Sequence, residues 1–132
     1  MDESSLRSVS LFEALTNDER HTVAQHADEI EVPEGTELVR QGEFAYEFFV
    51  LEEGTAEVVR DGERVAELGP GDFLGEIGIV TKAVRNATVV TTSPARAIVM
   101  TEQALRSIRR LNPVVAERIE AAVEERGPAL LG

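Results

Sequence analysis

Short runs of alternating apolar and polar residues fill the middle of the chain, between residues 28 and 101. A period of two residues is typical of β-strands that bury one face. Turn-forming residues, chiefly glycine, proline and aspartate, separate these runs. Regularly spaced short strands of this kind favour an antiparallel, jelly-roll-like β-barrel. The pattern predicts strands at residues 30–32, 37–39, 48–51, 56–59, 65–68, 85–92 and 95–101.

Two of the turns have sequences that also indicate their conformation. Asp61-Gly62 stands between two β-rich runs and predicts a tight two-residue hairpin, because both residue types tolerate a positive φ. Gly69-Pro70-Gly71 predicts a type II turn, in which proline presets φ at the second position and glycine supplies a positive φ at the third.

Helical patterns lie on both sides of the strand-rich part. Thr16 and Glu19 form a capping-box pattern, which predicts a helix that continues to about His26. Before it, residues 6–15 predict a loosely structured segment whose apolar side chains dock on the domain. These side chains are Val9, Leu11, Phe12 and Leu15.

Two more helices are predicted after the last strand. Thr101 is the expected N-cap of the first, which continues to about residue 111. Asn112 as N-cap and Pro113 as first helical residue begin the second, which continues to about Arg126. One face of this last helix is apolar and the opposite face is charged. The apolar residues are Val115, Ile119, Ala122 and Val123.

These elements define a single domain over residues 1–132. The fold class is mainly β with flanking helices: an antiparallel jelly-roll-like β-barrel with an N-terminal helix and two C-terminal helices. We expect an N-terminal helical segment at 1–27, a β-roll at 28–101 and C-terminal helices at 102–126.

The composition excludes several classes of site and partner. The 132 residues contain no cysteine, so neither disulfides nor thiolate metal sites are available. No apolar run approaches the roughly eighteen residues that a membrane span needs, and the N-terminus has no signal-peptide pattern. A net charge of −12 repels nucleic acid, so no direct nucleic-acid contact is expected. We therefore expect a cytoplasmic protein.

The glycine-rich stretch from Gly69 to Val90 has the residue types of an anion pocket. Its glycines allow backbone N–H groups to approach a ligand, and a short helical turn beginning at Glu76 would direct further N–H groups at a negative group. Arg85 can bind the same anion through the planar N–H donors of its guanidinium group. From these residues alone, Glu76 and Arg85 could equally form a structural ion pair.

The order of these residues resembles the phosphate-binding cassette of the cyclic nucleotide-binding domain family. The cassette would extend over residues 72–89, with Gly75-Glu76, Ile77 and Ile79, a variable loop, and then Arg85-Asn86-Ala87-Thr88-Val89. The resemblance covers nearly the whole chain. Leu38–Gly42 is similar to the family's early glycine turn, Phe48–Gly54 to its central hairpin, and Asn112-Pro113 to the start of its last helix.

The resemblance implies a role for each residue of the candidate site. Glu76 would accept from the ribose 2′-hydroxyl, and Arg85 would hold the cyclic phosphate. Backbone donors would come from Gly75, Glu76 and the Asn86-Ala87 peptides, and Ile77 would move with the cassette. Phe73 and Val89 would be apolar walls for the sugar and base. On the last helix, Ile119, Val123 or Arg126 would meet the base, and Arg126 could do so by stacking on it.

The implied function is a regulatory sensor without catalytic residues, metal or cofactor. Its ligand would be cyclic AMP first and cyclic GMP second. Asn86 follows the cassette arginine where the family has a small residue or a threonine, which leaves the base preference open. Binding would close the last helix over the ligand and signal to an unidentified effector protein or domain. The apolar stripe of that helix also allows a homodimer.

Two rival functions differ in class. A cupin-like enzyme needs histidines around a metal, but residues 28–101 contain none, and the five-residue spacing of His21 and His26 spreads them around their helix. A nucleotide-free interaction domain that keeps the fold stays open at this stage.

Overall fold

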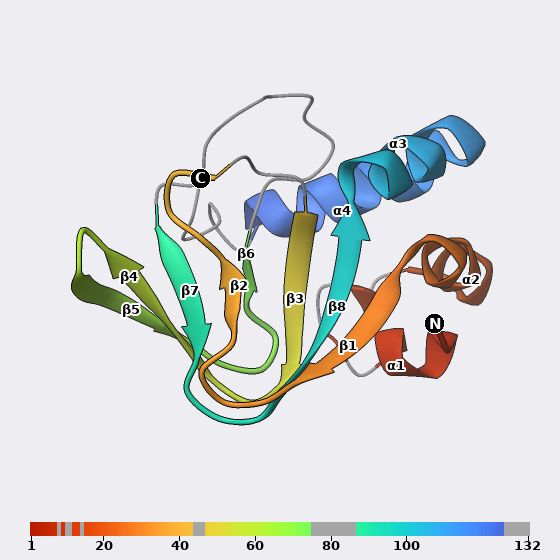
Figure 1. Ribbon diagram of the computed structural model, residues 1–132. Coiled ribbons are helices and arrows are strands. Elements are labelled where there is room, and N and C mark those ends of the chain that lie inside the picture. The colour runs from red at the N-terminus through yellow and green to blue at the C-terminus, as the bar shows by residue number, and fades with distance from the viewer. Residues whose placement is uncertain (8, 10–11, 14, 44–46, 75–86, 126–132) are drawn as a thin grey trace.

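The computed structural model describes residues 1–7, 9, 12–13, 15–43, 47–74 and 87–125 (Figure 1). Its helices are α1 (Glu3–Arg7), α2 (Asn17–His26), α3 (Glu102–Leu111) and α4 (Pro113–Glu125). Its strands are β1 (Asp28–Val32), β2 (Glu37–Val39), β3 (Glu47–Glu53), β4 (Ala56–Arg60), β5 (Glu63–Leu68), β6 (Phe73–Leu74), β7 (Thr88–Thr91) and β8 (Ala95–Thr101). None of the described helices is both long enough and apolar enough to cross a membrane.

The strands form two four-stranded antiparallel sheets, in the orders β1-β8-β3-β6 and β2-β7-β4-β5. The predicted jelly-roll-like fold is therefore confirmed, and the described strands leave each sheet with two edges instead of closing fully into a barrel. The physical reason lies at the bends. The chain passes from one sheet to the other after every strand except β4, so only β4 and β5 pair with each other as consecutive strands. Figure 1 shows the sheets meeting at the lower end and separating above it.

The bends at the lower end are joined by a buried threonine. Thr91, with 1% of its surface exposed, donates its hydroxyl to the Pro33 carbonyl at 2.8 Å. The same hydroxyl accepts from the Thr36 backbone N–H at 2.9 Å. Gly54 lies in the neighbouring bend with φ +92°, and a Cβ there would lie 2.5 Å from the Pro94 carbonyl oxygen. Only glycine fits both this conformation and this contact.

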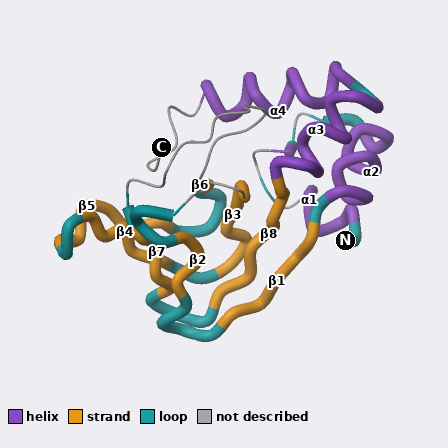
Figure 2. The backbone as a smooth tube through the Cα atoms, turned by 45° about the horizontal axis from the view of Figure 1, so that its top comes forward, coloured by secondary structure: helices purple, strands orange, loops and turns teal. Residues whose placement is uncertain are grey.

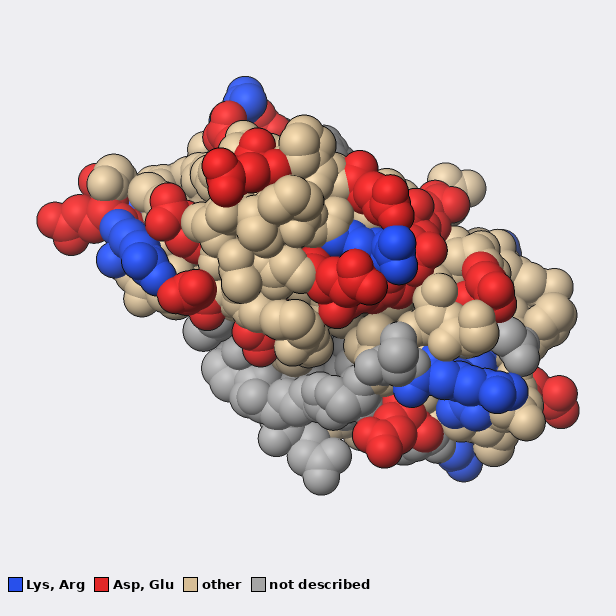
Figure 3. Space-filling model, turned by 90° about the horizontal axis from the view of Figure 1, so that it is seen from below, with Lys and Arg blue, Asp and Glu red and all other residues tan. Residues whose placement is uncertain are grey.

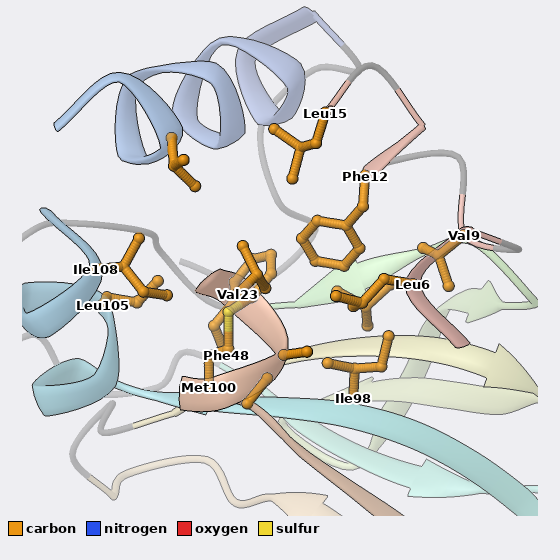
Figure 4. Packing of buried hydrophobic residues seen from close by; sticks show 14 of the residues in the cluster. Leu6, Val9, Phe12, Leu15, Val23, Phe48, Ile98, Met100, Leu105 and Ile108 are labelled. Carbon is orange, nitrogen blue, oxygen red and sulfur yellow. The ribbon is translucent and has the colours of Figure 1, made fainter. Parts of the chain in front are cut away.

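Strand β3 is buried on both faces, which divides the core into two clusters. Phe48 and Val50 face the helices, where they join apolar residues from the N-terminal segment, α2, α3 and the start of α4 (Figure 4). Phe49 and Leu51 point the opposite way, into the space between the two sheets. Alternation along a strand produces this division, since successive side chains point to opposite faces.

The helix boundaries agree closely with the local sequence signals. The Thr16 hydroxyl accepts from the Glu19 N–H at 3.2 Å, and the Glu19 carboxylate accepts from the Thr16 N–H at 2.8 Å, which confirms the capping box. Asn112 donates its N–H to Ile108 at the end of α3, and its Oδ1 accepts from the Val115 N–H at the start of α4. One residue therefore caps two helices.

The N-terminal segment is more regular than predicted. It contains helix α1. Farther along, the N–H groups of Val9, Phe12 and Leu15 each donate to the carbonyl three residues earlier. The predicted docking is confirmed, because those three side chains are buried, whereas Leu11 lies outside the described residues. Five residues are too few to show a helical period, so α1 left no clear pattern.

Two strand predictions need correction. The strand predicted at residues 85–92 is β7, which ends at Thr91, because the Thr92 N–H bonds to the Thr55 carbonyl in the bend. Residues 85 and 86 lie outside the described residues. Strand β6 was not predicted, since two residues cannot show a period of two, yet Phe73 pairs with Val50.

We predict that Gly54→Ala destabilises the protein more than Gly42→Ala does. The two glycines have nearly the same φ, +92° and +90°, so alanine is strained by roughly 1–2 kcal/mol at either position. Only at Gly54 does the new Cβ meet backbone, which adds about 2 kcal/mol. Urea unfolding of both variants measures the difference, and equal losses would contradict this account of the bend.

Candidate functional site

Most of the predicted site lies outside the described residues. These undescribed residues are Gly75, Glu76, Ile77, Arg85, Asn86 and Arg126. The structure does describe Phe73, Ala87 and Val89. It therefore shows the frame on which the cassette is mounted, and the roles assigned to Glu76 and Arg85 stay predictions.

The cassette is anchored to a different sheet at each end. Leu74 ends β6, which pairs with β3 in one sheet. Ala87 directly precedes β7, which pairs with β2 and β4 in the other sheet. Both anchor residues have 0% of their surface exposed and belong to the cluster between the sheets. Leu74 and Ala87 are thus both anchored in packed core, and a precise site needs such rigid support.

The structure does not bring the two predicted apolar walls into one cluster. Val89 lies with Ala87 in the cluster between the sheets. Phe73 lies in the helix-side cluster, where its ring centroid is 5.7 Å from that of Phe48. Because side chains alternate along β6, Leu74 and not Phe73 shares the side of Val89. Phe73 thus packs on the helix side of β6, whereas Val89 packs between the sheets.

A polar contact that sequence reasoning missed holds the start of β7. The Gln41 backbone N–H donates to the Thr88 hydroxyl at 2.9 Å. The Gln41 amide also exchanges two hydrogen bonds with Asp61 in the β4–β5 hairpin, at 2.8 and 3.0 Å. The glycine turn after β2 and this hairpin are therefore fixed beside Ala87. Nothing local could have revealed the contact, since its partners are 20 and 47 residues from Gln41.

The charge of Arg40, in the turn next to β7, is already balanced. Its guanidinium lies 3.3 Å from both Glu37 and Glu43. The hydrogen bond and charge of Glu37, followed by the charge of Glu43, raise the pKa of Arg40 above its ordinary value. Arg40 thus forms surface ion pairs with two neighbouring glutamates.

The two histidines, His21 and His26, both lie on helix α2. His21 is exposed, and the Nδ1 of half-buried His26 is 3.1 Å from the Thr22 carbonyl oxygen of its own helix. In the described part of the chain, no three acidic, histidine or cysteine side chains gather in a way that could hold a metal ion.

Comparisons with known proteins give the same assignment as the cassette motif. The family model of the cyclic nucleotide-binding domain matches residues 29–112. The chain therefore belongs to the cyclic nucleotide-binding domain family, a family of regulatory rather than catalytic domains.

One curated relative and two solved structures illustrate this membership. The cAMP-dependent protein kinase regulatory subunit of Schizosaccharomyces pombe is 35% identical over 88 residues, which are 66% of this chain and 21% of that protein. The chain thus spans a small part of that relative's length. A cyclic nucleotide-binding protein of Geobacter metallireducens has a TM-score of 0.81 at 20% identity, covering 95% of this chain and 94% of that one. The catabolite activator protein of Thermus thermophilus has a TM-score of 0.74 at 22% identity, covering 88% and 57%. At these identities the structures show the shared jelly-roll fold.

We predict that Phe73→Leu lowers stability without weakening nucleotide binding. The smaller side chain leaves a gap against Phe48 in the helix-side core, which costs about 1.5 kcal/mol. Unfolding and nucleotide titration are measured on the same preparation, with Phe48→Leu as the matched control. A tenfold loss of affinity in Phe73→Leu but not in Phe48→Leu would show that Phe73 contacts the ligand.

Proposed function

We propose that this chain is the sensor domain of a signalling protein and that its ligand is cyclic AMP, with cyclic GMP as the alternative. One observation carries the proposal: the family match spans residues 29–112, and within it the sequence has both cassette residues, Glu76 and Arg85. The presence of both residues in a glycine-rich loop inside the matched family region favours ligand binding over a nucleotide-free domain.

The chemistry of a cyclic nucleotide fits these residue types. A cyclic phosphodiester carries one negative charge, and each charge-assisted hydrogen bond to it contributes about 1.5–3 kcal/mol. A carboxylate would repel the phosphate, so Glu76 suits the neutral ribose hydroxyl. The net charge of −12 opposes an anion only weakly, because salt screens exposed charges over about 8–10 Å.

The preference for cyclic AMP is supported by the relative and left open by one residue. The relative at 35% identity is named as a cAMP-dependent regulatory subunit. Asn86 can donate or accept a hydrogen bond and does not by itself select a base.

The proposed mechanism is a shift between two positions of the last helix. In the position that the structure shows, the start of α4 packs on the helix-side core through Val115 and Ala116. Asn112 is the single residue between α3 and α4, which makes it the natural hinge. Arg126, just beyond α4, would then reach the base. Ligand can shift this equilibrium only by its higher affinity for the closed position. The unidentified effector protein or domain would recognise the closed position of the last helix.

We predict that the purified chain binds cyclic AMP and that Arg85→Ala removes most of the affinity, at least about a hundredfold for the loss of a bidentate contact. Glu76→Gln should weaken binding less, because the amide oxygen still accepts from the ribose. Isothermal titration measures both, after any carried-over nucleotide has been removed.

The matched control is Arg64→Ala, on the exposed surface of β5, which should bind as the natural chain does. Parallel titration with cyclic GMP resolves the question left by Asn86. The absence of binding to either nucleotide by folded, empty protein would refute the sensor and favour a nucleotide-free interaction domain.

A further inference from the structure

Four carboxylates surround one arginine on the outer face of the first sheet, near the bends. Arg96 lies on β8, between the two neighbouring strands. Its guanidinium contacts Glu31 on β1 at 2.6 Å and Glu53 on β3 at 3.5 Å. Glu29 on β1 and Glu52 on β3 complete the group. Figure 3, which views this end of the molecule, shows acidic side chains gathered around a small basic patch.

A bulge in β3 places Glu52 in an unfavourable position for a charged carboxylate. The register against β8 shifts between Leu51 and Glu53, so Glu52 is the extra residue. Its Oε1 atom is buried and has no hydrogen-bond partner among the described residues. Arg96 is already engaged by Glu31 and Glu53, so it offers Glu52 only its more distant charge.

The neighbour that Glu52 does contact is another carboxyl group. The side chains of Glu29 and Glu52 meet within hydrogen-bonding reach across β8. Two ionised carboxylates have no donor between them and repel each other, whereas one proton creates a donor and removes the repulsion. The contact is therefore favourable only while the pair holds a proton.

We propose that the Glu52 carboxyl group holds a proton at neutral pH and donates it in a hydrogen bond to Glu29, which braces β3 against β1. The site is separate from the cassette, and the inference does not depend on the proposed nucleotide. Its occupancy is set by pH, and its structural effect falls on the edge strand β1, which joins the helical segment to the roll.

The surrounding charges support this assignment. Burial, then the hydrogen bond and charge of Glu29, raise the pKa of Glu52 from its ordinary value to about 8. Arg96 lowers the pKa and Glu53 raises it further, but neither reverses the balance. On the adjoining turn, the Asp72 carboxylate is engaged by the Gly69 N–H at 2.8 Å.

The pH dependence of stability follows in sign. The folded chain holds the proton more tightly than the unfolded chain, so the stabilisation is fully present below the ordinary pKa of a glutamate. It falls as the pH rises and is lost once the pH has passed about 8. Glu52→Gln keeps a neutral side chain at every pH, so its melting temperature relative to the natural chain should rise through this window and then level off.

We predict that ¹³C NMR of the full chain, labelled at glutamate carboxyls, shows one signal titrating near pH 8. Glu52→Gln should abolish that signal, and Glu29→Gln should move it towards the ordinary glutamate range. The matched control is Glu57→Gln, a half-buried glutamate on the other sheet, which should leave the signal unchanged. The titration of the natural chain decides the question even if a variant fails to fold. If every glutamate titrates below about pH 6, or if the signal persists in Glu52→Gln, the proposal is wrong.

Discussion

The burial of β3 and β8 on both faces is the constraint on which the rest of the structure depends. Their side chains alternate between the helix-side core and the space between the sheets, so both layers of the molecule are built on the same two strands. Strand β6 pairs with β3, and this pairing fixes Leu74, the last described residue before the undescribed part of the cassette. The site therefore takes its position from the most deeply buried part of the fold. Figure 2 shows the four described helices gathered on the side of the β1-β8-β3-β6 sheet, away from the β2-β7-β4-β5 sheet.

Features specified by neighbouring residues could be predicted from the sequence. The capping box at Thr16, the hairpin at Asp61-Gly62 and the junction at Asn112 each depend on hydrogen bonds or φ values within a few residues. The type II turn is confirmed in the same way, since Gly71 has φ +91° and the Asp72 N–H bonds to the Gly69 carbonyl at 3.0 Å. Local chemistry alone determines such features.

Features that depend on distant partners could not be predicted. The contacts of Gln41 with Thr88 and Asp61, and of Glu29 with Glu52, exist only once the sheets have formed. The face of β6 that Phe73 takes could not be predicted for the same reason, since its position in the sequence next to the cassette says nothing about that face. The motif specified which residues have the chemistry for the ligand, whereas the fold decided which apolar side chains could face it.

The central claim is that the cassette between β6 and β7 binds a cyclic nucleotide through Glu76 and Arg85. A crystal structure of the chain grown with cyclic AMP tests it most directly. The account predicts the cyclic phosphate within hydrogen-bonding distance of the Arg85 guanidinium, with the ribose 2′-hydroxyl donating to Glu76 and the base on the side of Val89. A nucleotide bound elsewhere, or crystals in saturating cyclic AMP whose cassette holds no nucleotide, would contradict it.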